Sequence, residues 1–530
     1  MEIFNDQSTN EGRVNPSLWV NTADPLLFAP LSENIKTDVV IVGGGITGLS
    51  IAYSLIKNGK HVTVIERDSI GSGESSNTTA HVTNALDERY FHFEELFGEE
   101  DARLIAQSHT TAINFIEATV QREGIDCDFS RLHGYLFLHP SDDGKTLQDE
   151  LQASNRAGIR TELMQHVPGM NTDGSCLWFP NQAQFHPLKY IYGLCRAIIN
   201  GGGKIYTDTQ VKEIGSTSVK TAKFTITAEH IVVATNTPIN DLVTMHTKQF
   251  SYRSYVIAAT VPAGTIEPAL WWDTGDQDSP WVSKPYHYVR LQPFDENHDL
   301  LICGGEDHKT GQADKDRIRE QERFHFLEEW TRERFPTIQD IVYRWSGQVV
   351  EPIDSLAFIG KNPGDESIYI ATGTSGNGMT YSAIAGILIP DLILGFENPW
   401  TKLYDPSRLP LRAFREYLSE IGNMAAQYGD YLTAGDIESA KELHQDDGAI
   451  LKISGKRVAV YRDHEGSFHA FSAVCPHLGC SVKWNALEKS FDCPCHGSRF
   501  SSHGKVLNGP ANADLKSIEV RANELINTNP

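Results

Sequence analysis

The sequence predicts an α/β dinucleotide-binding domain of the Rossmann type, interleaved with an antiparallel α+β domain and followed by a small all-β domain. The first sign is a short apolar run, residues 38–42, that leads into a glycine-rich turn and an apolar helix. Amphipathic helical patterns such as residues 99–123 then mix with alternating, strand-like runs such as residues 286–291. After Gly448 the chain changes to short strand-like runs separated by Gly, Asn and Asp, which are typical of an all-β domain.

The length of the chain predicts several domains, because 530 residues are too many for one hydrophobic core. We expect an N-terminal arm over residues 1–36, the two interleaved domains over 37–400, a helical connection over 401–445 and the all-β domain over 446–530. Trp19 is expected to fix the arm to the body of the protein. The prolines and the charged helical pattern of the connection favour a docked segment over a flexible linker.

The composition and net charge of the chain limit the kinds of molecule that we expect it to bind. The net charge of −23 argues against nucleic acid and against anionic membrane surfaces. We expect no membrane span, because no stretch reaches the roughly 18 apolar residues that a span requires. The most apolar segment, residues 383–395, contains Pro390 and Asp391 and is predicted to be a buried helix. The N-terminus lacks the apolar core of a signal peptide, so we expect a cytoplasmic protein.

The glycine-rich turn has the pattern of a dinucleotide site. Gly43 permits a tight turn, Gly45 lets backbone amides approach a pyrophosphate, and Gly48 allows close packing of helix against strand. A second strand-like run ends in Glu66, whose carboxylate is placed to accept hydrogen bonds from a ribose. The alternative is a glycine-rich turn without a ligand. The strand, helix, second strand and terminal acid in register favour the nucleotide.

Five later segments carry a resemblance to a known family: residues 71–80, 185–187, 230–236, 352–360 and 370–379. Together with the glycine-rich turn they resemble the D-amino-acid oxidase/sarcosine oxidase/glycine oxidase family of flavoproteins, over about residues 36–400. The resemblance implies an FAD-binding domain interleaved with an antiparallel α+β substrate domain. It also implies further FAD-binding residues, namely Arg67, Thr79, Val211, Ala234, Thr235, Gly373, Gly376, Gly378 and Met379.

Two departures from that family bear on the cofactor and the substrate. Some relatives attach the flavin through a cysteine just before the late glycines, but residues 345–379 contain no cysteine, so we expect non-covalent FAD. The family's Gly-x-Arg-Pro segment, whose arginine binds a substrate carboxylate, is replaced by Gly-Gln-Val-Val-Glu-Pro at residues 347–352. Met379 and Thr380 stand in the region where sarcosine-type enzymes carry a lysine. These changes argue against an α-amino acid as the substrate.

One strand-like run, residues 286–290, offers other candidates for the substrate site. Arg290 would suit a substrate carboxylate, because a guanidinium binds a carboxylate through two hydrogen bonds. The alternative is an arginine that pairs with surface acids. Tyr286, His287 and Tyr288 are candidates for the pocket wall, although aromatic residues on a strand most often serve packing.

Near the C-terminus four cysteines fall within 21 residues, in the boxes Cys-Pro-His-Leu-Gly-Cys (475–480) and Cys-Pro-Cys-His-Gly-Ser (493–498). Two cysteines and two histidines also fit a zinc site by type, but zinc does not explain the additional cysteine in each box. The boxes resemble those of the Rieske [2Fe–2S] family, and residues 508–511 match that family's third loop. In that family one iron takes two thiolates and the other takes two imidazoles. The resemblance implies Cys475 and Cys493 on one iron, His477 and His496 on the other, and a disulfide between Cys480 and Cys495.

The two predicted cofactors together suggest a function. FAD accepts two electrons together whereas the cluster carries one, so we expect a dehydrogenase that oxidises a small amine-like or related molecule and passes electrons through the cluster. The acceptor would be a one-electron acceptor protein or a quinone. A docked acceptor would require exposed ring edges on both His477 and His496.

Two other functions stay open. One is an oxidase that uses oxygen and has a structural or regulatory Rieske domain, and the other is an electron-transfer component without an organic substrate. A Rieske oxygenase would need a further iron site built from two histidines and a carboxylate, and no such set stands out.

Overall fold

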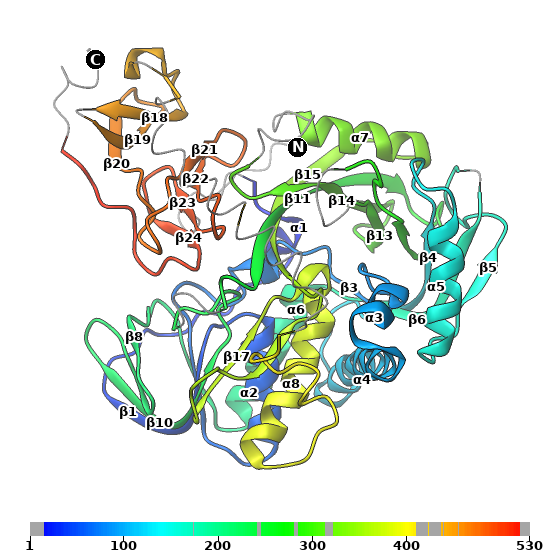
Figure 1. Cartoon of the computed structure of the whole chain (residues 1–530), viewed down its shortest axis with the longest axis horizontal. Coiled ribbons are helices and arrows are strands. Elements are labelled where there is room, and N and C mark those ends of the chain that lie inside the picture. Colours follow the sequence, from blue (N-terminus) through cyan, green and yellow to red (C-terminus); the bar gives the residue numbers. More distant parts are fainter. Residues whose placement is uncertain are drawn as a thin grey trace.

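The computed structural model describes residues 15–519 except 173, 241–244, 280–284, 313–321, 410–435 (apart from Gly422), 438 and 454. Two large β-sheets lie in the first 372 residues, and two small ones lie in the C-terminal part (Figure 1). The fold class is therefore confirmed: an α/β FAD-binding domain is interleaved with an antiparallel domain, and a small all-β domain follows.

The first large sheet is mostly parallel and has the strand order β16-β17-β10-β1-β2-β7, with β9 and β8 added beside β10. The second half of its central strand β1, residues 39–42, is apolar and buried, as a strand covered on both faces requires. Val42 of β1 is aligned with Ile65 of β2 and Val233 of β10, so the residues that follow all three strands meet at one edge. The bounds are β1 Ile35–Val42, β2 Val62–Ile65, β7 Lys204–Tyr206, β8 Glu213–Ile214, β9 Ser218–Lys220, β10 Thr225–Val233, β16 Phe358–Lys361 and β17 Ile368–Thr372.

Helices α2 (Ile46–Lys57), α6 (Pro187–Asn200), α8 (Gly378–Leu394) and α4 (Glu99–Glu123) form the layer around this sheet. The predicted buried helix is confirmed as the C-terminal part of α8, which packs between α2 and α4. Among the described residues, one helical stretch, Ser375–Leu394, is long and apolar enough to cross a membrane, and 72% of its apolar window is buried inside the protein.

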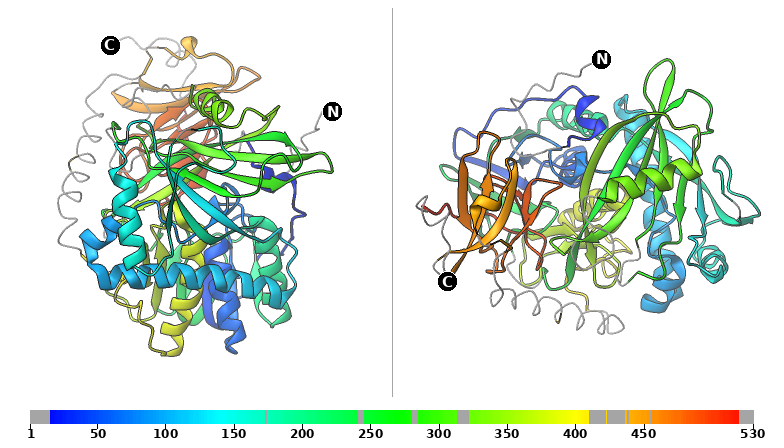
Figure 2. Two further views of the ribbon diagram at one scale, coloured as in Figure 1. Left: turned by 90° about the vertical axis from the view of Figure 1, so that its right-hand side faces the viewer. Right: turned by 90° about the horizontal axis from the view of Figure 1, so that it is seen from above.

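The second large sheet is mostly antiparallel, with the order β15-β11-β14-β13-β12-β4-β6-β3 and β5 beside β6. Its long strands β11 and β14 are covered by helix α7, while α3 and α5 lie toward the other end (Figure 2). The strand bounds are β3 His81–Val82, β4 Ser130–Phe137, β5 Glu162–Met164, β6 Cys176–Gln184, β11 Gln249–Pro262, β12 Leu270–Asp273, β13 Tyr288–Pro293, β14 His298–Lys309 and β15 Ile341–Pro352. The helix bounds are α3 Tyr90–Phe97, α5 Lys145–Arg156 and α7 Arg323–Arg334.

The C-terminal part, drawn in orange and red, lies beside the β11–β15 end of the second sheet (Figures 1 and 2). A three-stranded antiparallel sheet contains β18 Asp447–Ile453, β19 Lys456–Arg462 and β20 Phe468–Ser472. A four-stranded sheet contains β21 Lys483–Asn485, β22 Ser490–Asp492, β23 Arg499–Ser501 and β24 Val506–Asn508.

The N-terminal arm is fixed as expected, at the short helix α1 (Leu18–Asn21). Trp19 is fully buried, and its indole N–H donates to the Thr78 carbonyl at 2.6 Å. Most of the predicted helical connection, residues 401–445, lies outside the described residues. The domain boundaries therefore stay predictions.

Candidate cofactor sites

The glycine-rich turn joins β1 to α2 at the carboxyl edge of the first sheet. Gly43 has a φ of +116°, and a Cβ on it would lie 2.4 Å from the Ala234 carbonyl oxygen. A Cβ on Gly48 would lie 2.1 Å from the Gly43 carbonyl oxygen. Only glycine therefore fits either position. The N-cap residue of α2 is Gly45, which supplies no side-chain cap. The Ile46 amide donates to the Ser75 hydroxyl at 3.1 Å, and the start of the helix lies at the cofactor edge, where a helix N-terminus favours phosphate.

Glu66 follows β2 at the same edge. Its carboxylate accepts hydrogen bonds from the Gly44 amide at 2.7 Å and from the Asp68 amide at 2.9 Å. Burial raises the pKa of Glu66, against the effect of these two hydrogen bonds. The acid thus holds the glycine-rich turn in place, in addition to its predicted contact with a ribose.

A cavity of about 1170 Å³ opens from this edge and reaches the second sheet. Ordinary small-molecule sites span roughly 300–1,000 Å³, so the cavity suits a dinucleotide together with a small second molecule. Of the predicted FAD-binding residues, Gly48 and Gly373 shape the backbone without lining the cavity. Those that line it are Gly43, Gly45, Glu66, Arg67, Thr79, Val211, Ala234, Thr235, Gly376, Gly378 and Met379. The glycine cradle and the size of the cavity fit FAD, and the contacts of single residues with FAD stay predictions.

At its other end the cavity is lined by acids and tyrosines that sequence reasoning missed as a group. Asp87, Asp307 and Glu351 line it together with Tyr286 and Tyr288. A Cβ on Gly376 would lie 2.3 Å from an Asp87 carboxylate oxygen and 2.8 Å from the Tyr286 hydroxyl, which places these groups beside the late glycines. The tyrosine candidates are thus at the cavity, and their catalytic role stays a prediction.

Burial changes the ionisation of these acids. It raises the pKa of Asp307 to about 7, and burial together with the charge of Asp87 raises the pKa of Glu88 to about 7. Burial also raises the pKa of Glu351 well above its usual value. One oxygen of Asp307 and one of Glu88 are buried without a hydrogen-bond partner among the residues that the structure describes. Asp307 lines the cavity and can therefore gain a negative charge near neutral pH, whereas Glu88 lies outside the cavity lining.

The structure contradicts the predicted role of Arg290 as the residue that binds a substrate carboxylate. Its guanidinium is fully buried outside the cavity lining and donates to the carbonyl oxygens of Thr79, Ala80 and Phe185 at 3.0–3.1 Å and to Gln292. It therefore neither binds a substrate carboxylate nor pairs with surface acids. It joins two backbone segments, residues 79–80 and Phe185, to its own strand β13 instead.

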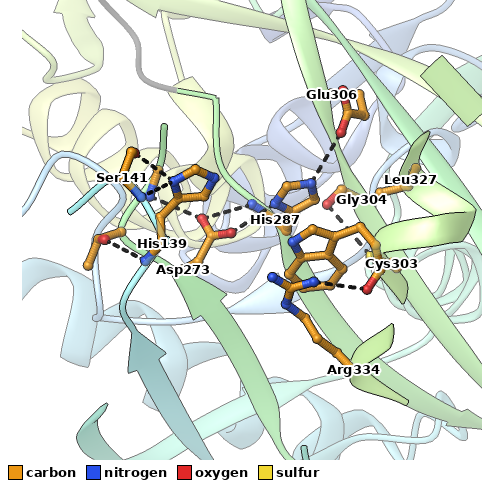
Figure 3. Close-up of polar contacts among 12 residues, drawn as sticks. His139, Ser141, Asp273, His287, Cys303, Gly304, Glu306, Leu327 and Arg334 are labelled. Atoms are coloured by element: carbon orange, nitrogen blue, oxygen red, sulfur yellow. Dashed lines mark hydrogen bonds and ion pairs between the residues drawn. The ribbon is translucent and has the colours of Figure 1, made fainter. Parts of the chain in front are cut away.

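His287 does not form part of the pocket wall either. It lies between Asp273 and Glu306, at 2.8 Å and 3.3 Å, and stacks on Trp330 with ring centroids 4.1 Å apart (Figure 3). Burial alone would lower the pKa of His287, but the two carboxylates overcome this effect and raise it to about 9. His287 is thus part of a structural ion-pair network.

The two cysteine–histidine boxes come together as predicted. The structure joins Cys480 and Cys495 in a disulfide, which leaves Cys475 and Cys493 as free, buried thiols. The pKa of Cys475 lies below its usual value because its sulfur accepts hydrogen bonds from the Cys493 thiol, from backbone amides and from the Ser498 hydroxyl. The sulfur atoms of Cys480, Cys493 and Cys495 all lie within 4.8 Å of one another.

The two predicted imidazole ligands face each other. The rings of His477 and His496 have centroids 4.9 Å apart. Two thiols, two imidazoles and converging backbone amides fit a [2Fe–2S] cluster of the Rieske type, and the assignment of the four ligands stays a prediction. The third loop is present, since the Ala511 amide donates to the Ser498 hydroxyl at 3.0 Å.

The expectation that both histidines have exposed edges is wrong. His496 is only 7% exposed. His246, from the flavin-binding part of the chain, packs edge-on against both rings, with centroids 4.8 Å from His477 and 6.3 Å from His496. His246 could not be identified from the sequence, because it lies 231 residues before His477 in an irregular segment.

Because Phe500 has no hydroxyl, we predict a redox potential for the cluster below that of the respiratory members of the Rieske family. Phe500 is fully buried on β23, in the apolar cluster that contains the four cysteines. Respiratory members of the Rieske family carry a tyrosine two residues after the serine that corresponds to Ser498, and its hydroxyl adds a hydrogen bond at the cluster. Phe500→Tyr is expected to raise the midpoint by about 40 mV, since a hydrogen bond contributes about 1 kcal/mol. A redox titration followed by electron paramagnetic resonance measures this, and an unchanged midpoint would contradict it.

Comparisons with known proteins agree with this geometry. Residues 38–392 match the family model for FAD dependent oxidoreductases, and residues 434–519 match the model for the Rieske [2Fe-2S] domain. The chain is 33% identical to a putative Rieske 2Fe-2S iron-sulfur protein, YhfW of Bacillus subtilis, over 95% of this chain and 97% of that protein. It is 28% identical to the gamma-glutamylputrescine oxidoreductase of Escherichia coli, over 69% of this chain and 86% of that protein.

The fold also matches a solved structure, L-proline dehydrogenase from P. horikoshii. The TM-score is 0.58 with 22% sequence identity, over 71% of this chain and 98% of that one. The fold, the glycine cradle, the paired cysteine–histidine loops and the two family matches lead to one conclusion. The chain belongs to the FAD-dependent oxidoreductase family and carries a Rieske [2Fe–2S] domain at its C-terminal end.

Proposed function

We propose that this oxidoreductase is a dehydrogenase that oxidises a small cationic amine and delivers electrons through the Rieske cluster to an external one-electron acceptor, a protein or a quinone. FAD, when bound, takes two electrons from the substrate, and the cluster carries them away one at a time. The observation that carries the proposal is that the loops with the predicted cluster ligands pack directly on the flavin-binding part of the same chain.

Three contacts support this packing. Gln348 of β15 donates to the Gly497 carbonyl at 2.9 Å, and Gln312 donates to the Pro494 carbonyl at 3.0 Å. A Cβ on Gly497 would lie 2.3 Å from the Ser251 hydroxyl oxygen, so the backbones approach as closely as glycine allows. With His246 against both predicted imidazole ligands, the ligand face of the Rieske domain is turned toward the flavin-binding part. This packing supports the proposal that the cluster, when present, receives electrons from FAD inside the chain.

Because His496 is buried, we expect the acceptor to dock beside the half-buried His477 alone, and not at both histidines. Val474 and Leu478 flank His477 on the same loop and are 40% and 36% exposed. Exposed apolar side chains on a loop that carries cluster ligands suit a transient acceptor, because such encounters bury small surfaces. We place this reaction in the cytoplasm, since the four cysteines outside the boxes are all free, buried thiols.

The acidic end of the cavity supports a cationic substrate. Asp87, Asp307 and Glu351 line this end of the cavity. Arg253 lines the cavity too, but its guanidinium donates to the Ser346 hydroxyl and, at 2.9 Å, to the Glu488 carboxylate. Arg290 is engaged with backbone carbonyls outside the lining. Glu351 stands in the segment where amino-acid oxidases carry the arginine that binds a carboxylate. The faces of Tyr286 and Tyr288 add further attraction for a cation. The gamma-glutamylputrescine oxidoreductase among the relatives bears an amine in its name, which agrees with this proposal.

The proposal predicts that cations bind more tightly as the pH rises. Burial raises the pKa of Asp307, which lines the cavity, to about 7, and a carboxyl group becomes negative above its pKa. Tetramethylammonium keeps its charge at every pH, so its inhibition constant reports the protein alone. We expect this constant to fall about tenfold between about pH 6 and pH 8. Asp307→Asn should flatten the profile, whereas Asp278→Asn, at an exposed position outside the cavity lining, should not.

An anaerobic reductive titration tests the whole proposal. A screen of primary and secondary amines and of amino acids, read by loss of the flavin absorbance, identifies the substrate class. Uptake of one electron equivalent beyond the two that FAD accepts, with a Rieske signal in electron paramagnetic resonance, is the expected result. Bleaching by amino acids alone, or uptake of two equivalents without the signal, would overturn it.

A further inference from the structure

We propose that the Rieske domain supplies part of the FAD-binding site, at the end that holds the adenosine half of the cofactor, so that docking of this domain controls how tightly the chain retains FAD. The segment 505–514, which contains β24 and the third loop, lines the same cavity as the glycine-rich turn. In folds of this type the acid at the end of the second strand binds the adenosine ribose. The neighbourhood of Glu66 is therefore the adenosine end.

Two of the residues predicted to bind FAD at this end are bonded to the Rieske domain. The Arg67 guanidinium donates to the Leu507 carbonyl at 3.2 Å. The Asn512 side-chain amide donates to the Val211 carbonyl at 3.1 Å, and the Asn512 side-chain oxygen accepts a hydrogen bond from Gln210 at 3.0 Å. The adenosine end of the cavity therefore has walls from both domains.

Contacts on two further sides hold the segment in place. The Asn508 side-chain amide donates to one carboxylate oxygen of Glu74 at 2.7 Å. The other carboxylate oxygen of Glu74 accepts a hydrogen bond from the backbone N–H of Gln348 at 2.7 Å. A Cβ on Gly509 would lie 2.7 Å from the Thr237 hydroxyl oxygen. Glu74 and Thr237 follow β2 and β10, the same two strands that end at the cofactor edge. The Rieske segment thus closes over that edge.

A ligand that contacts two domains couples them. If FAD binds more tightly when the Rieske domain is docked, bound FAD must stabilise the docked domain by the same free energy. A chain whose Rieske domain has not folded or docked then loses FAD, so the flavin is retained where its electron outlet is in place. This inference is independent of the substrate and of the acceptor.

A double variant of the full-length protein tests the coupling. Asn508→Ala/Asn512→Ala removes hydrogen bonds across the cavity, and we expect the Kd for FAD to rise at least about tenfold, measured by the fluorescence of released flavin. The Rieske signal should remain, which shows that the domain is folded. Lys452→Ala, at an exposed position of β18 outside the cavity lining, should leave the Kd unchanged. An unchanged Kd in the double variant with an intact Rieske signal would overturn the proposal.

Hydrogen exchange in the wild-type protein gives a second test that needs no variant. Addition of FAD to the FAD-free protein is expected to slow amide exchange in residues 505–514 as well as in residues 43–49. Slower exchange confined to residues 43–49 would show that FAD contacts only its own domain, and would overturn the proposal.

Discussion

Gly43→Ala is expected to yield a folded protein that no longer retains FAD. The new Cβ would lie 2.4 Å from the carbonyl oxygen of Ala234 and 2.8 Å from its carbonyl carbon. Both atoms belong to the backbone directly after β10, a central strand of the first sheet. The φ of +116° adds strain, because side chains rarely adopt it. Relief of the collision must move the turn that presents amides to the pyrophosphate. We expect the affinity for FAD to fall at least about 100-fold, since strain alone costs about 1–3 kcal/mol.

A matched control variant separates the effect of the atomic collision at position 43 from the effect of backbone strain alone. Gly59, after α2, also has a positive φ of +79°, but a Cβ there would meet no atom within 4 Å. Gly59→Ala should therefore cost about 1 kcal/mol of stability and leave the FAD content unchanged. Flavin absorbance per polypeptide after purification, with the unfolding transition measured alongside, distinguishes the two variants. Full FAD content in Gly43→Ala would contradict the assigned site.

The fold and both cofactors could be predicted from the sequence because their signals are local. The turn at Gly43 lies between a strand and a helix only a few residues away, and backbone strain restricts it to glycine. The cluster boxes place a cysteine, a histidine and a second cysteine within six residues, and two such boxes pair through one disulfide. Local constraints of this kind leave a pattern that a single chain displays.

The substrate end could not be predicted in the same way. Asp87, Asp307 and Glu351 come from three segments that only the second sheet brings together, and single acids are common on an acidic chain. Arg290 carried a plausible charge on a plausible strand, but its direction depends on packing against Thr79 and Ala80, about 210 residues away. Charge and residue type are visible in a sequence, whereas the direction of a side chain is not.

Contacts between the domains were invisible for a related reason. Arg67 and Leu507 are 440 residues apart and interact through a backbone carbonyl, which leaves no requirement on the residue type at position 507. His246 packs on both predicted imidazole ligands from a segment without a regular pattern. The sequence therefore predicted two redox centres, and the structure was needed to show that the two parts of the chain predicted to hold them are in contact.

Cys493→Ser is expected to remove the cluster and to lower reduction of a one-electron acceptor at least about 100-fold, while the substrate still bleaches the flavin. A cluster held by two thiolates and two imidazoles loses one of its two thiolates in this variant. The disulfide between Cys480 and Cys495 remains to join the two loops, so the domain keeps a crosslink. The Rieske signal should vanish, and anaerobic reduction should take up one electron equivalent fewer than in the wild type. Cys303→Ser, at a buried free thiol of β14, is the matched control and should change neither measurement.

The same variant discriminates among the three functions. Loss of acceptor reduction with retained bleaching supports the dehydrogenase. Unchanged turnover with stoichiometric peroxide from oxygen would identify an oxidase whose Rieske domain is structural or regulatory, and a wild-type flavin that no amine bleaches but a partner protein reduces would identify an electron-transfer component. The assays must contain excess FAD, because the Rieske segment 505–514 lines the FAD cavity and loss of the cluster would loosen it. When FAD is saturating, the flavin site of the variant is fully occupied. Any remaining loss of acceptor reduction is then due to the missing cluster.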